Sequence, residues 1–136
     1  MKAILVDDEQ LARERLNSLL SHAEEAPEII AETGSAREAV KLINKKKPDV
    51  VFLDIQMPVL DGFDVVSLLE EPRPYIIFVT AYDDYAIKAF EVHALDYLTK
   101  PVRMERLQDT LNRLIEIHKL KKEQKIAFDK VMEEQK

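Results

Sequence analysis

Residues 50–58 read VVFLDIQMP, and the rest of the chain is best interpreted from this stretch. Its first four residues are apolar and three of them are β-branched or aromatic, which predicts a short strand buried on both faces. Asp54 ends the run, and Pro58 stops any regular element soon afterwards. Because ligands bind at the carboxyl ends of parallel strands, Asp54 is expected at a functional edge of a sheet. The alternative is an ordinary aspartate that begins a turn.

The composition describes one globular domain. The chain has 136 residues, of which 46% are hydrophobic and 34% charged, and this is enough for a single core. It contains no apolar run long enough to span a membrane, and we expect no signal peptide. The lack of cysteine excludes disulfides, thiolate zinc sites and a thiol nucleophile, and fits a cytoplasmic protein. A net charge of −6 argues against the chain holding nucleic acid by itself.

Strand-like and helix-like segments alternate along the chain. Short apolar runs predict strands, and apolar spacings of three and four residues predict amphipathic helices between them. Right-handed crossovers then give an α/β fold, a doubly wound parallel sheet with helices on both faces. On the inner face of the fourth helix we expect Ala86, Ala89 and Phe90. The strands are expected at residues 2–6, 29–32, 50–53, 75–79 and 94–98, and the helices at 10–21, 36 to about 47, 63–69, 84–91 and 103 to about 119.

Polar groups follow four of the expected strands. They are Asp7-Asp8-Glu9 after the first strand, Asp54 after the third, Thr80 at the end of the fourth and Lys100 after the fifth. Each has an ordinary explanation alone, but in a doubly wound sheet these strand ends meet in one cleft. Carboxylates about 4 Å apart repel by several kcal/mol per pair at an effective dielectric constant of about 20, so the cluster is expected to bind a cation.

The side chains at these strand ends favour phosphoryl chemistry. Carboxylate oxygens without imidazole or thiolate suit Mg²⁺ or Mn²⁺ rather than zinc. Asp54 would attack a phosphoryl group, Lys100 would neutralise the developing charge and Thr80 would hydrogen-bond a phosphoryl oxygen. The three histidines lie elsewhere, in helices or loops, and are interpreted as structural or solvent-facing; they are His22, His93 and His118.

Taken together, these motifs resemble the receiver domain of a two-component response regulator, over residues 2 to about 117. The resemblance implies a flavodoxin-like (βα)5 receiver fold with strand order 2-1-3-4-5, in a domain of about residues 1–118. The matching motifs are Asp7-Asp8, Asp54 with Met57-Pro58, Asp61-Gly62, Thr80-Ala81, and Tyr97 with Lys100-Pro101.

The same resemblance implies a role for each motif at the acidic edge. Asp54 would accept a phosphoryl group from a sensor histidine kinase. Asp8, Asp54 and the backbone carbonyl of Gln56 would bind Mg²⁺ (or Mn²⁺), and Asp7 would act mainly through a metal-bound water. The chain would then be a regulatory phosphoacceptor rather than an enzyme with a substrate of its own.

Receiver domains also imply a switch and a partner face. Thr80 and Tyr97 would form the switch pair, and Lys100 would contact the phosphate. The Lys100-Pro101 bond would be cis, an isomer that X-Pro bonds adopt readily. A homodimer would form through the fourth helix, the fifth strand and the fifth helix.

A narrower resemblance lies in residues 82–86, 89–91 and 94–98, which are similar to the receivers of LytR/AlgR transcription regulators. The second half of those regulators is a LytTR-type DNA-binding domain, which would follow Lys136. DNA binding is therefore expected of the full-length protein and not of these residues. Whether the chain is a piece of such a regulator or a stand-alone receiver is left open.

Three other classes of protein share part of this pattern. A haloacid-dehalogenase-like phosphatase needs a second aspartate two residues after its nucleophile, where this chain has Gln56. A flavodoxin-like flavin carrier cradles phosphate in its first loop, and the acids at residues 7–9 would repel it. A pseudo-receiver that only binds partners would usually lack part of the acidic set, which this chain keeps.

The tail, residues 116–136, has two possible structures. Ile117, Leu120, Ala127 and Val131 form an apolar stripe that could extend the last helix, although Gln124 and several lysines interrupt it. The segment at 119–136 is therefore expected to be either a solvated linker or a helical extension that projects from the domain. In the second case it would pair with another copy as a short coiled coil.

Overall fold

The computed structural model describes residues 1–135, in which five strands alternate with five helices. The strands are β1 (Lys2–Val6), β2 (Glu28–Thr33), β3 (Val50–Leu53), β4 (Tyr75–Thr80) and β5 (Asp96–Thr99). The helices are α1 (Gln10–His22), α2 (Ala36–Lys46), α3 (Gly62–Ser67), α4 (Ala86–Glu91) and α5 (Met104–Glu134). All pairings are parallel and the strand order is β2-β1-β3-β4-β5. The predicted doubly wound α/β fold and its strand order are confirmed.

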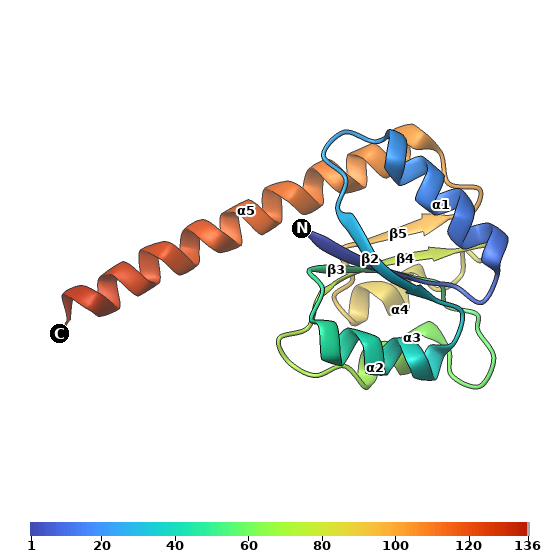
Figure 1. Cartoon of the computed structure of the whole chain (residues 1–136), viewed down its shortest axis with the longest axis horizontal. Helices are drawn as coiled ribbons and strands as arrows, with labels where there is room; N and C mark the ends of the chain where they lie inside the picture. Colours follow the sequence, from blue (N-terminus) through green and yellow to red (C-terminus); the bar gives the residue numbers. More distant parts are fainter. Residues whose placement is uncertain (136) are drawn as a thin grey trace.

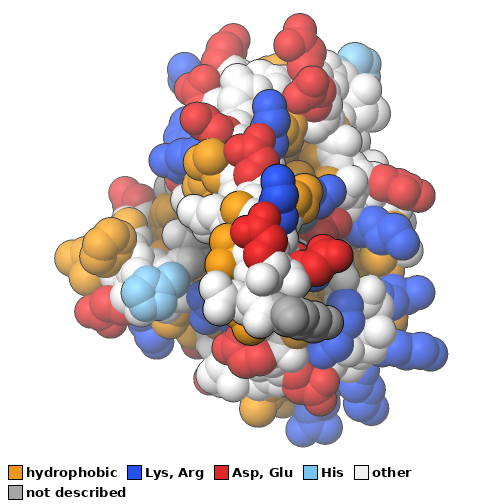
Figure 2. All heavy atoms as spheres, turned by 90° about the vertical axis from the view of Figure 1, so that its left-hand side faces the viewer, with side chains coloured by type: hydrophobic (Ala, Val, Ile, Leu, Met, Phe, Trp, Pro, Cys, Tyr) orange, Lys and Arg blue, Asp and Glu red, His pale blue; other side chains and the backbone are white. Residues whose placement is uncertain are grey.

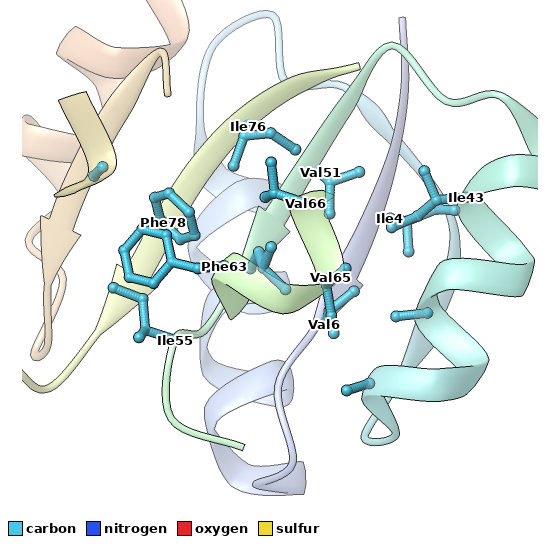
Figure 3. Packing of buried hydrophobic residues seen from close by; sticks show 14 residues of the cluster. Ile4, Val6, Ile43, Val51, Ile55, Phe63, Val65, Val66, Ile76 and Phe78 are labelled. Atoms are coloured by element: carbon cyan, nitrogen blue, oxygen red, sulfur yellow. The ribbon is translucent and has the colours of Figure 1, made fainter. Parts of the chain in front are cut away.

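Helices cover both faces of the sheet. Figure 1 shows α1 and α5 on one face and α2, α3 and α4 on the other. Alternate residues of β3 enter different cores: Val51 and Leu53 pack on the side of α2 and α3, and Val50 and Phe52 on the side of α1 and α5. Figure 3 shows the first of these cores. This explains the unbroken apolar run of β3, because neither face of this central strand is exposed to water.

The inner face of α4 differs from the prediction. Ala89 is buried, but Ala86 is exposed and the Phe90 side chain is 82% exposed. Successive helical residues are about 100° apart, so a helix of less than two turns that buries Ala89 turns Phe90 away from the sheet. Phe90 and Ile87 instead make an apolar surface on α4. The assignment of Ala86 and Phe90 to the core was wrong.

Helix α5 takes the helical of the two structures expected for the tail. It continues without interruption to Glu134, well past the boundary expected at about Lys119. Its first part is held in the core by Leu107, Leu111 and Leu114, and every described residue from Lys119 onwards is exposed. Figure 1 shows this second part, residues 119–134, extending from the domain; we call it the projecting helix. Within residues 1–135, no helix is both long and apolar enough to cross a membrane.

Helix α3 begins directly against the backbone of Asp54. The amide of Gly62 donates to the carbonyl of Ile55 over 2.8 Å, and Asp61 and Asp64 form a reciprocal cap on the helix. A Cβ atom at Gly62 would lie 2.5 Å from the carbonyl oxygen of Asp54. Glycine is therefore required here by the close approach of α3 to the end of β3.

We predict that Gly62→Ala lowers the free energy of unfolding by about 1–3 kcal/mol, because the added methyl group meets backbone that cannot move aside. Urea unfolding monitored by circular dichroism measures this. Gly34→Ala is the matched control, because its Cβ would meet the flexible end of Arg13 at 3.0 Å. It should cost no more than about 0.5 kcal/mol. Equal losses in the two variants would contradict the explanation.

A partly buried carboxylate, that of Asp96, links β5 to α5. The two oxygens of Asp96 accept from both terminal nitrogens of Arg106, at 2.7 and 2.8 Å, and Oδ2 also accepts from the Thr110 hydroxyl at 2.6 Å. Arg113 adds an ion pair at 2.7 Å. Burial alone would raise the pKa of Asp96, but the hydrogen bonds from Arg106, Thr110 and the Tyr97 amide lower it to about 2.

This low pKa predicts a pH-dependent contribution to stability. An aspartate with a depressed folded-state pKa stabilises the fold above its unfolded pKa, and the contribution, about 2 kcal/mol here, is lost as the pH falls from about 4 through about 2. Asp96→Asn should therefore lower the free energy of unfolding by about 2 kcal/mol at neutral pH, and by about half as much near pH 3. Urea unfolding at both pH values measures it. The exposed Asp129→Asn should change neither value, and a pH-independent loss in Asp96→Asn would contradict the assignment.

Candidate functional site

Backbone hydrogen bonds just beyond the strands hold the carboxyl ends of neighbouring strands side by side. The amide of Asp7 donates to Thr33 over 3.1 Å, that of Asp54 to Val6 over 2.9 Å, and that of Lys100 to Thr80 over 2.7 Å. Each bond joins the residue after one strand to a neighbouring strand. The sheet therefore brings Asp7, Asp54, Thr80 and Lys100 to one edge, as the sequence predicts.

Lys100 connects the two buried carboxylates of this edge. Its Nζ lies 2.7 Å from Oδ2 of Asp7 and 3.2 Å from Oδ2 of Asp54. Asp54 is only 5% exposed and Asp7 only 7%. Burial raises the pKa of Asp54. The charge of Lys100 offsets part of this rise, and the charge of Asp7 adds to it. For Lys100, burial acts to lower the pKa, but hydrogen bonds and charge from Asp7 and Asp54 outweigh it, and the pKa is raised.

Three carboxylates come close enough to share a cation. Asp7, Glu9 and Asp54 each offer an oxygen atom, and these atoms lie within 4.8 Å of one another. The predicted ligand Asp8 has an exposed side chain and is not in this group. Glu9 was not singled out as a ligand from the sequence, although its place in the acidic run after β1 was a signal. Oxygen ligands of this kind suit Mg²⁺ or Mn²⁺, so the donor set fits the predicted ion.

Gln56 lies just after Asp54 in the chain, and its side chain contacts one of a pair of tyrosines, Tyr82 and Tyr85, that were not predicted as site residues. Its side-chain amide donates to the hydroxyl of Tyr85 over 2.9 Å, and the ring of Tyr85 stands edge-on to that of Tyr82, with centroids 6.3 Å apart. The Tyr97 hydroxyl in turn donates to the backbone carbonyl of Tyr82. The presence of two tyrosines close together in the segment after β4 was the sequence signal for this contact.

The predicted switch residues lie on neighbouring strands. Thr80 is fully buried at the end of β4, where its hydroxyl accepts from the Tyr82 amide at 3.4 Å. Tyr97 is half-buried on β5, paired with Phe78 of β4. Both therefore contact the segment that leads from β4 to α4. The Lys100-Pro101 peptide bond is cis, as predicted.

The comparisons with known proteins agree with this geometry. Residues 3–112 match the family described as the response regulator receiver domain. The chain is 53% identical over 115 residues to the transcriptional regulatory protein BtsR of Salmonella typhi, which covers 84% of this chain and 48% of that protein. It is 51% identical over 120 residues to an uncharacterized response regulatory protein of Vibrio cholerae, covering 88% of this chain and 50% of that one.

Solved structures give the same result. The response regulatory domain of mrkE from Klebsiella pneumoniae has a TM-score of 0.77 and 34% identity, and the match covers 86% of this chain and 97% of that domain. The chain spans about half the length of the curated relatives it matches. With its parallel sheet, its acidic edge and the lysine beside it, the chain belongs to the response regulator receiver domain family.

Proposed function

We propose that this chain is the phosphoacceptor domain of a two-component regulator, in which Asp54 takes a phosphoryl group from a sensor histidine kinase. The observation that supports it best is the pairing of buried Asp54 with Lys100 beside two further carboxylates. A carboxylate in this setting is a nucleophile that needs no general base. The residue two positions after Asp54 is Gln56, hydrogen-bonded to Tyr85, so a dehalogenase-type acid is missing from that position.

In the proposed transfer, an oxygen of Asp54 forms a bond to phosphorus while the phosphorus–nitrogen bond of the kinase phosphohistidine breaks. The electron pair of the broken bond leaves with the imidazole. Lys100 already lies against Oδ2 of Asp54, so its charge is in place to stabilise the phosphoryl oxygens as they arrive. Thr80, at the adjacent strand end, would donate its hydroxyl to one of these oxygens.

The proposed metal ligands come from the ends of β1 and β3. Asp8, Asp54 and the backbone carbonyl of Gln56 remain the predicted direct set, with Asp7 in a supporting role, and Glu9 becomes a further candidate because of its place in the cluster. A bound Mg²⁺ or Mn²⁺ would supply positive charge that offsets repulsion between these carboxylates and the phosphoryl oxygens. Burial is the main cause of the raised pKa of Asp54, and the charge of Asp7 adds to it.

We further propose that phosphorylation acts on α4, β5 and α5 through Thr80 and Tyr97. Drawing the Thr80 hydroxyl towards a phosphoryl group would remove its bond with the Tyr82 amide, and Tyr97 is held by the carbonyl of the same residue. A small change at Tyr82 would thus bias the packing of this segment. Ile87 and Phe90 expose apolar surface on α4, which suits a homodimer face.

The output of the switch is proposed to lie in another part of the regulator. BtsR is named as a transcriptional regulatory protein, and it is about twice as long as the segment matched here. We propose that a LytTR-type DNA-binding domain would follow the projecting helix in the full-length protein. DNA is then a partner of that domain, and the receiver controls it through the state of α4, β5 and α5.

The first prediction identifies the acceptor. Incubation with acetyl phosphate and Mg²⁺ should add one phosphoryl mass to the wild-type protein, and Asp54→Ala should abolish the addition because the nucleophile is lost. Intact mass spectrometry measures it, after circular dichroism has shown that the variant folds. Asp83→Ala, which changes an exposed aspartate after β4, is the control and should be labelled normally. Removing Mg²⁺ with a chelator should suppress the labelling of the wild-type protein and of Asp83→Ala. Labelling that persists in Asp54→Ala would disprove the assignment.

A second prediction concerns the projecting helix. Leu120 and Val131 of this helix, and Ile117 just before it, are exposed at coiled-coil spacings, so we expect two copies to pair along this stripe. Ending the chain after Ile117 should weaken dimerisation at least about tenfold, equivalent to about 1.4 kcal/mol. Sedimentation equilibrium of the phosphorylated protein measures it. An unchanged dimer affinity would show that the segment is only a linker.

A further inference from the structure

A concave site lies at the amino ends of the central strands, opposite Asp54. Three segments line it: residues 47–49 before β3, residues 72–75 at the start of β4, and one side of α5 between His118 and Lys125. Its volume is about 430 Å³, within the range of small-molecule sites, and one side is open to solvent. We call this hollow the lysine pocket. It shares no lining residue with the acidic edge, and it sits where the projecting helix leaves the domain.

Its lining concentrates positive charge in an acidic protein. Five of its side chains are cationic, and its single carboxylate, Asp49, is 2.7 Å from the amide of Lys2, which donates to it. Two of the cations are engaged, Lys47 with Glu70 at 3.2 Å and Arg73 with the carbonyl of Val92. The other three, Lys121, Lys122 and Lys125 on α5, form no ion pair with a described residue. Figure 2 shows the face from which the end of α5 projects, where lysine and arginine side chains lie among carboxylates.

Two polar atoms in the same lining lack partners. The hydroxyl of Tyr75 and Nδ1 of His118 are both buried, and neither has a hydrogen-bond partner among the described residues. Their rings meet edge-on with centroids 6.0 Å apart, and Nζ of Lys121 lies 5.5 Å from the centre of the Tyr75 ring. Buried polar groups are nearly always paired, so these two atoms beside one pocket hold unused hydrogen-bonding capacity, which a small movement of either side chain would offer to a ligand.

The shape and charge of the pocket favour one class of ligand. An acceptor placed among free lysines is an anion, and phosphate groups offer several oxygens to ammonium, hydroxyl and imidazole donors at once. A DNA duplex presents its phosphates along an extended surface, and the net charge of −6 would repel it. A pocket of this size instead encloses a compact ligand.

We propose that the lysine pocket binds a small anion with several phosphate groups. The lysines of α5 provide the charge, and Tyr75 and His118 provide the buried donors. Residues of α5 and of the segments that lead into β3 and β4 would hold the same ligand. Binding would therefore fix the base of the projecting helix against the domain. This site is separate from Asp54, so it does not depend on the proposed phosphoacceptor function.

Titration calorimetry with tripolyphosphate tests the proposal in buffer freed of divalent cations, which keeps the acidic edge out of the measurement. The wild-type chain should bind one equivalent, and Lys121→Ala/Lys125→Ala should bind at least about tenfold more weakly. The matched control is Lys119→Ala/Lys130→Ala, which removes the same charge from exposed positions on the same helix outside the lining. It should bind within about twofold of the wild type, because long-range attraction is largely screened.

A third variant tests the buried donors. Tyr75→Phe should weaken binding at least about threefold, while its melting temperature stays unchanged or rises, because the hydroxyl has no partner to lose. Amide chemical shifts should move at residues 72–75 and 118–125 and stay constant around Asp54. The proposal is overturned if tripolyphosphate does not bind, or if the two lysine pairs lose affinity equally. It is also overturned if Tyr75→Phe binds tripolyphosphate as tightly as the wild type, or if the chain binds a short DNA duplex but not tripolyphosphate.

Discussion

The contact of Lys100 with Asp7 and Asp54 is the interaction on which the acidic edge depends. Two carboxylates with exposures of 5 and 7% would repel each other strongly without a cation between them. The ammonium group comes from the residue after β5, and the backbone bond from its amide to Thr80 fixes where it can stand. The fold therefore assembles this edge by bringing a charge from the far end of the sheet to its centre. A phosphoryl group arriving there would meet a cation already in position.

The fold was largely predictable because its central strand has an unambiguous sequence. In a sheet with one solvent-exposed face, every second residue of a strand would be polar. The four residues of β3 are all apolar, and their side chains alternate between two cores. The predictions failed where packing decides and periodicity does not. Phe90 fits a helical stripe on paper, but α4 has only six residues and buries one of them. The sequence left the structure of residues 119–136 open because charged residues are as compatible with an exposed helix as with a linker.

The site was predictable where residue type and strand position coincide. Asp7, Asp54, Thr80 and Lys100 all follow or end strands, and a parallel sheet brings such positions together regardless of the loops. Loop conformation is what the sequence could not provide. Asp8 and Glu9 are adjacent in an acidic run, and only the backbone after β1 decides that the carboxylate of Glu9 joins the cluster. Likewise, the bond from Gln56 to Tyr85 joins two loops whose separation no spacing rule gives.

The continuity of α5 gives the molecule a mechanical property. The same helix is clamped to β5 through Asp96 at one end and reaches free solvent at Glu134 at the other. At about 1.5 Å per residue, the segment beyond the domain is a rod of roughly 24 Å. A tilt of about 5° at its base would displace its tip by roughly 2 Å, by the geometry of such a rod. A rearrangement too small to alter the core would thus become a displacement of about 2 Å at the end of the helix.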